Sequence, residues 1–314
     1  MPLVSVIVPN YNHADFLDQR LESVLTQTFQ DFEVIILDDR STDNSVQVIE
    51  RYKHHPRVSH VVINETNSGS TFRQWVKGIG LAAGEYIWIA ESDDWCEPTF
   101  LHTAVAGLQA DPTAVVAYCQ SYCIINNNEI KWQSAYPLLQ DYQKGPEFIH
   151  KHMLNGNAIF NASMAVWKKE VFKKNSPEFT TYTFCGDWLF WIELCTHGTV
   201  FISGKLLNYF RKHNKDVSGK AYKSGLNFRE EVRMMNYLHA AGIIQYGQYL
   251  DTLKSKFLIY QLTKPSLPPH ERATVEDLFF SHPGIKSKLT GYYNKWITKH
   301  RIKTWLTRPF SAKK

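Results

Sequence analysis

The sequence predicts an α/β fold with a mostly parallel sheet and flanking helices, followed by a helical extension. Three observations favour this class. Strand-like and helix-like segments alternate through the first 95 residues. Polar or acidic loops follow the first, second and fourth strand-like segments, as at the carboxyl edge of an open α/β sheet. Neither GxGxxG nor GxxxxGKS/T occurs, which disfavours ordinary dinucleotide-binding and P-loop proteins.

In the first half of the chain, β-branched and aliphatic runs predict the strands, and helical spacing or cap-rich starts predict the helices. The predicted strands lie at 4–8, 32–37, 58–63 and 86–90. The predicted helices lie at 15–27, 41–52 and 71–83. This order of strand, helix and strand indicates right-handed crossovers within a parallel sheet.

Beyond residue 95 the predicted elements are less regular. They comprise helices near 98–110, 148–154 and 188–197, strands at 114–118, 162–167, 200–202 and 206–210, and a hairpin within 120–145 that turns at 126–128. From about residue 224 the pattern is helical, punctuated by Pro265, Pro268 and Pro269. The predicted domains are therefore residues 1–215 and 216–314.

Length and composition limit the possible classes. The 314 residues suffice for one large α/β domain with an extension or for two small domains, and 44% hydrophobic residues support a substantial core. Five cysteines without a CxxC pair or zinc-like spacing predict free thiols in a reducing compartment. No signal-like segment precedes the first strand and no apolar run is long enough to span a membrane, so we expect a cytoplasmic protein.

The segment from Gly84 to Trp95 carries the first indication of chemistry. Gly84 suits a turn, residues 86–90 suit a buried strand, and Asp93 and Asp94 follow at its carboxyl end. Two adjacent carboxylates repel each other, and a bound Mg²⁺ or Mn²⁺ is one way to stabilise them, since oxygen ligands favour these ions over zinc. The alternative is a turn that leads into the helix near 98–110.

Several motifs together resemble the family 2 glycosyltransferases, whose Rossmann-like fold is called GT-A. The matching runs are 4–12, 33–45, 67–69 and 82–95, in this order. The resemblance is strong over about residues 1–100, moderate to about 215 and absent beyond. It implies an inverting, metal-dependent enzyme that moves a sugar from a nucleoside-diphosphate sugar, with UDP or dTDP favoured, to a hydroxyl of a glycan or lipid-linked acceptor. It also implies a role in cell-surface polysaccharide synthesis.

The resemblance assigns four residues to the nucleotide. Pro9 and Tyr11 would border the base, with the ring of Tyr11 packed on it. Asp39 would accept a hydrogen bond from a ring N–H, which suits uracil or thymine, and Arg73 would reach the base or the phosphates. The alternatives are an ordinary loop aromatic for Tyr11, a turn cap for Asp39 and a solvated helix residue for Arg73.

The resemblance assigns four more residues to the sugar, the metal and the chemistry. Asp93 would touch the ribose or the sugar, Asp94 would ligate Mn²⁺ or Mg²⁺, and His213 would approach the metal or the diphosphate. An acceptor hydroxyl needs a base to take its proton, and Asp187 is the candidate. The alternatives are a plain helix cap for Asp187 and a basic surface loop for His213.

Two other functions remain open at this point. A nucleotidyltransferase acting on sugar phosphates also uses a metal and a nucleotide, but the Gly/Lys-rich phosphate loop expected near residue 10 is missing. A catalytically inactive nucleotide-sugar-binding partner would keep the fold without the acids, yet Asp94 and Asp187 are both present.

The last stretch of the chain is strongly basic. Residues 286–314 contain nine Lys or Arg residues and no Asp or Glu, so the rest of the chain is net negative although the whole carries +5. Aromatic residues are interspersed with these charges, which predicts docking on an anionic membrane surface, on the inner face of the membrane. The alternative is a helix packed on the body with a solvated basic face. Nucleic acid is disfavoured because no recognition motif accompanies the charge.

Overall fold

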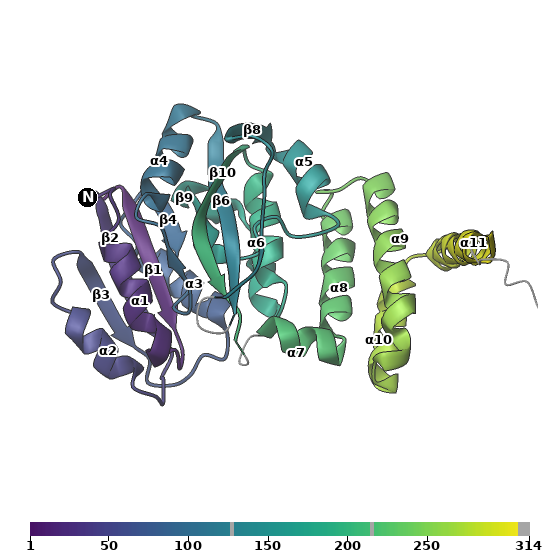
Figure 1. Cartoon of the computed structure of the whole chain (residues 1–314), viewed down its shortest axis with the longest axis horizontal. Coiled ribbons are helices and arrows are strands. Elements are labelled where there is room, and N and C mark those ends of the chain that lie inside the picture. The colour runs from purple at the N-terminus through teal and green to yellow at the C-terminus, as the bar shows by residue number, and fades with distance from the viewer. Residues whose placement is uncertain (126–128, 214–216, 307–314) are drawn as a thin grey trace, which may run out of the picture. The chain divides into compact units, whose positions relative to one another are not determined.

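The computed structural model describes residues 1–125, 129–213 and 217–306. It consists of two compact units, Met1–Asp216 and Val217–Lys314. The first unit contains one mixed sheet with flanking helices, and the second is helical (Figure 1). The predicted α/β class with a mostly parallel sheet and a helical C-terminal region is confirmed.

The first four strands form the parallel part of the sheet, in the order β3-β2-β1-β4. They are β1 Val4–Asn10, β2 Phe32–Asp38, β3 Val58–Ile63 and β4 Tyr86–Ile89. The helices between them are α1 Ala14–Leu25, α2 Ser45–Tyr52 and α3 Thr71–Leu81. Strands β1, β2 and β4 are buried along their whole length, which explains why their sequences are continuously apolar rather than alternating.

The sheet continues from β4 through β9, β6 and β10 to β5. These strands are β5 Trp95–Cys96, β6 Ala114–Ile125, β9 Ala165–Lys168 and β10 Thr199–Arg211. Strand β9 is antiparallel to both β4 and β6, and β10 is parallel to β6. The carboxyl ends of β1, β2, β4, β6 and β10 therefore lie at the same edge of the sheet.

Shorter elements complete the first unit. They are α4 Phe100–Ala110, β7 Glu129–Gln133, β8 Gln140–Lys144, α5 Gly145–Phe148, the π-helical turn Ile149–Met153, the 3₁₀ turns Ala162–Met164, Lys169–Lys174 and Pro177–Thr181, and α6 Gly186–Cys195. Strands β6 and β7 pair antiparallel, as the hairpin prediction requires. The predicted turn at 126–128 lies outside the described residues.

Two predictions of local structure were wrong in detail. The strands expected at 200–202 and 206–210 are one strand, β10, whose register against β6 shifts between these two parts. The strand expected at 162–167 begins as a 3₁₀ turn and becomes β9 only at Ala165. Gly84 lies in a bend before β4, as expected, and close packing favours glycine there, because a Cβ would lie 2.6 Å from the backbone nitrogen of Ser5.

The second unit has its own core. Its helices are α7 Val217–Ser224, α8 Leu226–Ala240, α9 Tyr246–Thr263, α10 Pro269–Phe279 and α11 Ile285–Leu306, with a 3₁₀ turn at Lys264–Ser266. Phe257 and Phe279 pack edge to face with ring centroids 5.2 Å apart. Near the start of α11, Leu289 is fully buried and the ring of Tyr293 contacts that of Phe257. One face of the early part of this helix therefore packs within its own unit.

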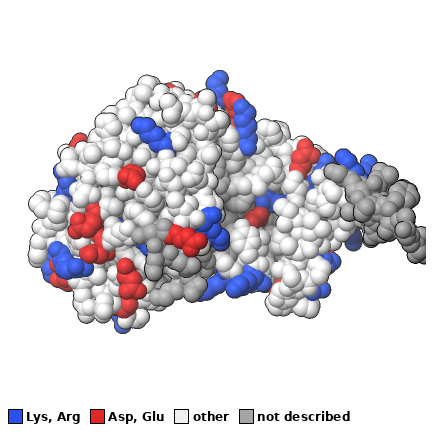
Figure 2. Space-filling view, viewed as in Figure 1, with Lys and Arg blue, Asp and Glu red and all other residues white. Residues whose placement is uncertain are grey.

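The exposed side of α11 is basic. Figure 2 shows Lys and Arg side chains gathered over the described part of this helix. Lys288 Nζ donates to the hydroxyl of Tyr246 at 2.8 Å, and Lys286 lies over the ring of Phe280. None of the helices in the described parts of the chain has the length and apolarity needed to cross a bilayer.

Candidate active site

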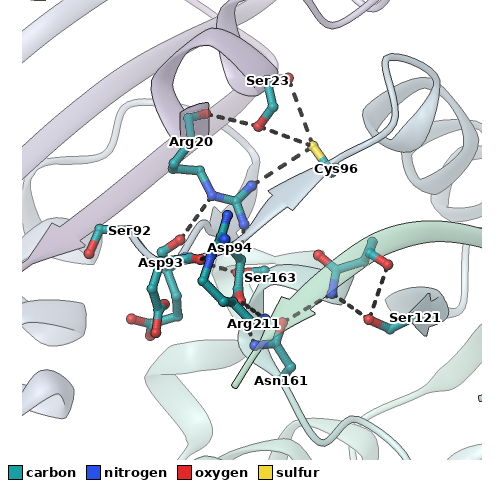
Figure 3. Close-up of polar contacts among 12 residues, drawn as sticks. Arg20, Ser23, Ser92, Asp93, Asp94, Cys96, Ser121, Asn161, Ser163 and Arg211 are labelled. Atoms are coloured by element: carbon teal, nitrogen blue, oxygen red, sulfur yellow. Dashed lines mark hydrogen bonds and ion pairs between the residues drawn. The ribbon is translucent and has the colours of Figure 1, made fainter. Parts of the chain in front are cut away.

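The candidate site lies at the sheet edge where the parallel strands end. Loops after β1, β2, β4 and β10 bring together polar side chains that are far apart in sequence. Figure 3 shows the part of this edge around Asp93 and Asp94. The two aspartates follow β4 directly, yet the structure gives them different surroundings.

Asp94 is a buried structural carboxylate. Only 1% of the residue is exposed, and its Oδ2 atom accepts hydrogen bonds from Asn161 Nδ2 and Ser163 Oγ, each at 2.7 Å. Its Oδ1 atom accepts from the backbone N–H of Arg211 at 3.0 Å. Burial, together with the charge of Asp93, raises the pKa of Asp94 to about 6. The side chain thus joins β4 to the segment before β9 and to the end of β10.

Arg20, on α1, contacts the same turn. It is fully buried, and its Nε–H donates to the carbonyl oxygen of Glu91 at 2.9 Å. One of its terminal nitrogens lies 3.9 Å from Asp94 Oδ2, and the guanidinium lies over the ring of Trp88. The sequence analysis missed this residue. The available signal was a charged side chain on the apolar face of α1, three residues after Leu17 and four before Val24.

Asp93 faces two histidines instead. Its side chain is 20% exposed, and Asp93 Oδ2 lies 3.0 Å from His213 Nε2. Burial alone would raise the pKa of Asp93, but the hydrogen bond with His213 and the charges of His13 and His213 hold it below the ordinary value. One ligand atom from each of His13, Asp93 and His213 lies within 4.8 Å of the others.

Each member of this His/Asp cluster follows a different parallel strand. His13 follows β1, Asp93 follows β4 and His213 follows β10. His13 Nδ1 lies 2.8 Å from Ser92 Oγ, and the rings of His13 and His213 meet edge to face at 5.4 Å. Among the described residues this is the group of acidic, histidine and cysteine side chains that could hold a metal ion. Asp94, the ligand expected from the sequence, lies outside this group.

Glu91 is a third acidic residue in the segment 91–94, and its surroundings differ from those of Asp93 and Asp94. Its Oε1 atom accepts a hydrogen bond from Trp75 Nε1 at 2.9 Å. Burial, followed by the nearby charge of Asp93, raises the pKa of Glu91 to about 8. Glu91, Asp93 and Asp94 therefore differ in pKa and in exposure although they belong to one turn.

The residues expected around the base lie at the ends of β1 and β2. Pro9 is buried within β1, whereas Tyr11 follows the strand and is 47% exposed. Asn12 adopts the left-handed conformation with φ of 57°, and its Oδ1 atom accepts from the backbone N–H of Thr42 at 2.7 Å. This bond ties the loop that carries Tyr11 to the loop after β2.

Asp39 is nearly buried and already engaged by the protein. Its Oδ1 atom accepts from Asn64 Nδ2, the Ser68 amide and Gln74 Nε2 at 2.6, 2.8 and 2.9 Å, and its Oδ2 atom accepts from Ser68 Oγ at 2.8 Å. Arg73 is exposed, and its Nη1 donates to the carbonyl of Ser68 at 2.8 Å. The structure therefore places Asp39 and Arg73 around one loop.

Asp187, expected just before a helix at 188–197, lies in the first turn of α6 because that helix begins at Gly186, and it is half-buried. Asn157 Nδ2 lies 3.4 Å from its Oδ2 atom. Asn157 belongs to the same short segment as Asn161 and Ser163, the donors to Asp94. The two acids predicted to act together thus flank one segment of seven residues, 157–163.

Known proteins share sequence and fold with this chain. The profile of glycosyl transferase family 2 matches residues 5–175. The chain belongs to this family. The names of its relatives describe glycosyltransferases.

Two relatives illustrate the range of the family. The chain is 29% identical over 183 residues to the uncharacterized glycosyltransferase YibD of Escherichia coli K12, covering 56% of this chain and 51% of YibD. It therefore spans about half the length of that relative. It is 34% identical over 119 residues to an E. coli chondroitin synthase, covering 38% of this chain and 17% of the synthase.

Solved structures show the same fold. Residues 1–349 of Staphylococcus aureus TarS, in complex with UDP-GlcNAc, superpose with a TM-score of 0.63 at 19% identity, covering 96% of this chain and 92% of TarS. The mannosyltransferase PcManGT from Pyrobaculum calidifontis, in complex with GDP-Man and Mn²⁺, gives a TM-score of 0.54 at 17% identity, covering 98% and 88%. The GT-A fold expected from the sequence is confirmed.

Proposed function

We propose that this glycosyltransferase is an inverting, metal-dependent enzyme that transfers a sugar from a nucleoside-diphosphate sugar to a hydroxyl of a glycan or lipid-linked acceptor. The observation that carries the proposal is the His13–Asp93–His213 cluster at the carboxyl edge of the sheet. Asp187 stands on the other side of the segment that holds Asp94 in place. Together they supply a metal site and a base, which this reaction needs.

The cluster fits a divalent cation by its chemistry. Two imidazole nitrogens and one carboxylate oxygen form a mixed donor set, which suits Mn²⁺ better than Mg²⁺, an ion that prefers oxygen ligands. We therefore favour Mn²⁺ and move the ligand role from Asp94 to Asp93, with His213 and His13 beside it. A bound cation would stabilise the negative charge of the departing nucleoside diphosphate.

Asp187 acts as the general base in this proposal. Its carboxylate accepts the proton of the acceptor hydroxyl while the oxygen forms a bond to the anomeric carbon and the bond to the diphosphate oxygen breaks. The first turn of α6 stabilises a negative charge at this position, and the Asn157 amide orients the carboxylate. Inversion follows from a single displacement without a covalent sugar–enzyme intermediate.

The donor nucleotide would lie along the loops after β1 and β2. Tyr11 offers an exposed ring on which a base can pack, beside Pro9. We favour UDP and dTDP sugars as donors, and TarS was solved with UDP-GlcNAc. Asp39 would act on the nucleotide indirectly, through the loop that its hydrogen bonds organise. Calorimetry with UDP, dTDP and GDP in the presence of Mn²⁺ tests this preference, since tighter GDP binding would reverse it.

Substitution of Asp187 tests the proposed reaction directly. The wild-type enzyme, incubated with Mn²⁺ and a panel of nucleotide sugars, should release nucleoside diphosphate. Asp187→Asn should lower transfer by about 10²–10⁴-fold, because the acceptor loses its base, while calorimetric binding of the nucleotide stays within about twofold. Asn157→Ala is the matched control and should lower transfer less, since it removes only the orienting amide. Wild-type turnover in Asp187→Asn would eliminate Asp187 as the base.

A role in cell-surface polysaccharide synthesis is part of the proposal, supported by the chondroitin synthase similarity. We also propose that residues 286–314 dock on an anionic membrane face, where each Lys or Arg near the surface contributes roughly 1 kcal/mol. The exposed basic side of α11 supports this. Flotation with two kinds of vesicle tests it, one of phosphatidylglycerol mixed with phosphatidylcholine and one of phosphatidylcholine alone. Failure of the protein to float with the anionic vesicles would reject the docking.

A further inference from the structure

Strand β7 carries an exposed tryptophan at the rim of the candidate site. Within the described residues β7 pairs with β6 alone, with Trp132 opposite Cys123. Trp132 is 40% exposed. The ring of Trp132 therefore presents apolar surface to solvent on an edge strand.

The ring is nevertheless held in place. Trp132 packs edge to face on Phe160, with ring centroids 5.1 Å apart and planes at 68°. Phe160 in turn contacts Phe210 on β10 at 5.9 Å, and the ammonium group of Lys212 lies 5.0 Å from the centre of the Phe210 ring. These four residues, the Trp132 platform, combine a fixed aromatic surface with one cation at its margin.

The Trp132 platform lies next to the residues proposed for transfer. Phe160 directly precedes Asn161, whose amide donates to Asp94 at 2.7 Å. Phe210 directly precedes Arg211, whose Nε–H donates to the backbone carbonyl of Asp93 at 2.9 Å. Both rings that support Trp132 are thus one residue away from contacts to the aspartate pair. The segment that carries Phe160 also carries Asn157, the partner of Asp187.

We propose that the Trp132 platform is the acceptor subsite and that it binds the apolar face of a pyranose ring of the acceptor. This inference rests on the proposed function, because it places the acceptor on the side where Asp187 would take its proton. The C–H groups on one face of a pyranose carry partial positive charge and pack on the negative face of an aromatic ring, while its hydroxyls stay hydrated. The platform suits one sugar ring rather than a protein partner, because a stable protein interface would need a far larger surface.

Fluorine NMR on the whole chain tests this inference. The chain is labelled with fluorotryptophan, and the resonance of Trp132, one of nine tryptophans, is assigned as the one that disappears in Trp132→Phe, with Trp132→Tyr as a second assignment variant. The probes are the methyl β-glycosides of glucose, galactose, mannose and N-acetylglucosamine. We expect at least one glycoside to shift the Trp132 resonance in a saturable manner and to leave the resonances of buried tryptophans such as Trp167 in place.

Farnesyl phosphate is the competing probe, since an apolar surface near the site would also suit the lipid part of an acceptor. The inference is overturned if no glycoside moves the Trp132 resonance, or if farnesyl phosphate moves it and the glycosides do not. Gln133→Ala, at the exposed neighbouring position on the opposite face of the same strand, is the matched control and should leave the glycoside response unchanged.

A kinetic experiment separates this inference from the proposed function. Release of nucleoside diphosphate without an acceptor should be the same in Trp132→Ala and in the wild type, whereas the extra release stimulated by a bound glycoside should fall at least tenfold. If the wild type neither binds nor cleaves any nucleotide sugar, the proposed function fails, while the NMR response still reports on sugar binding. Equal stimulation in Trp132→Ala and the wild type would remove Trp132 from the acceptor site.

Discussion

Asp93 and Asp94 are neighbours in the chain and have the same side chain, but Asp93 belongs to a partly exposed cluster, which we call open, and Asp94 to a buried one, which we call closed. Asp94 is 1% exposed and accepts hydrogen bonds from three residues of distant segments. The Asp93 side chain is 20% exposed and faces two histidines. A carboxylate whose oxygens are occupied by protein donors stabilises the fold, whereas one that faces other ligand atoms can take up a ligand.

The two environments also affect each other. The charge of Asp93 is one reason why the pKa of Asp94 is raised, and burial is the larger one. The positive charge of Arg20 acts in the opposite direction and lowers the pKa of Asp94. The two carboxylates in the turn after β4 thus repel each other, and a positive ion at Asp93 would reduce this repulsion. Such a loss of folding stability is expected at a binding site.

The largest effect should come from Asp94→Ala. This change removes the acceptor for Asn161 and Ser163 and leaves the buried guanidinium of Arg20 without its carboxylate. We expect the free energy of unfolding to fall by about 3–5 kcal/mol, as for other broken buried ion pairs. Urea denaturation of the metal-free chain measures it.

Asp93→Ala is the matched control for that measurement. It removes a partly exposed carboxylate and the repulsion that this carboxylate exerts on Asp94. It also removes the hydrogen bond to His213, so the free energy of unfolding should fall by no more than about 1 kcal/mol. Equal destabilisation by the two substitutions would abolish the distinction between the open and the closed aspartate.

The next effect concerns binding rather than stability. Asp93→Ala and His213→Ala should each weaken Mn²⁺-dependent nucleotide binding by about 10- to 100-fold, since each removes one of the three groups that converge there. Calorimetric titration of UDP with and without Mn²⁺ measures it. An Asp94→Asn variant that folds should keep the Mn²⁺ dependence, so its loss there, with Asp93→Ala binding normally, would return the ligand role to Asp94.

The sequence was sufficient for the parallel half of the sheet, because three of its four strands, β1, β2 and β4, are buried on both faces and therefore have continuously apolar sequences. It also placed Asp187 at the start of a helix, although α6 begins two residues earlier than the predicted 188. It could not separate Asp93 from Asp94. Their difference depends on Asn161, Ser163 and Arg211, which reach the turn only through the pairing of β9 and β10 with the rest of the sheet.

Glu33, at the start of β2, is a carboxylate outside the site that, like Asp94, is hydrogen-bonded by the protein. It accepts hydrogen bonds from Ser5 Oγ at 2.6 Å and from the Ala83 amide at 2.8 Å. Burial on its own would raise the pKa of Glu33, but these bonds and one from Ser59 bring it below the ordinary value of 4.5. Because the pKa is lower in the folded chain, the stabilisation is complete above pH 4.5 and is lost as the pH falls through the folded value.

Glu33→Gln should therefore cost about 1–2 kcal/mol of unfolding free energy at pH 7 and progressively less as the pH falls below about 4.5. Denaturation of both chains at several pH values gives the difference between them. Nucleotide binding at pH 7 should be unaffected, since Glu33 lies at the opposite end of β2 from Asp38. A difference that stays constant with pH would mean that the charge of Glu33 contributes nothing to folding.

The smallest effect is expected for Arg73→Ala. Arg73 is exposed and its guanidinium donates to the carbonyl of Ser68, in the loop that Asp39 organises. An exposed arginine with one such bond contributes little to folding, so the denaturation midpoint should not move. If the guanidinium reaches the donor as the family resemblance implies, UDP affinity should fall by about three- to tenfold and depend less on salt, because one positive charge near the phosphates is lost. Lys77→Ala, one turn further along α3, is the control of equal charge, and its affinity should match the wild type. Unchanged affinity in Arg73→Ala would assign Arg73, like Asp39, to the support of the loop rather than to contact with the nucleotide.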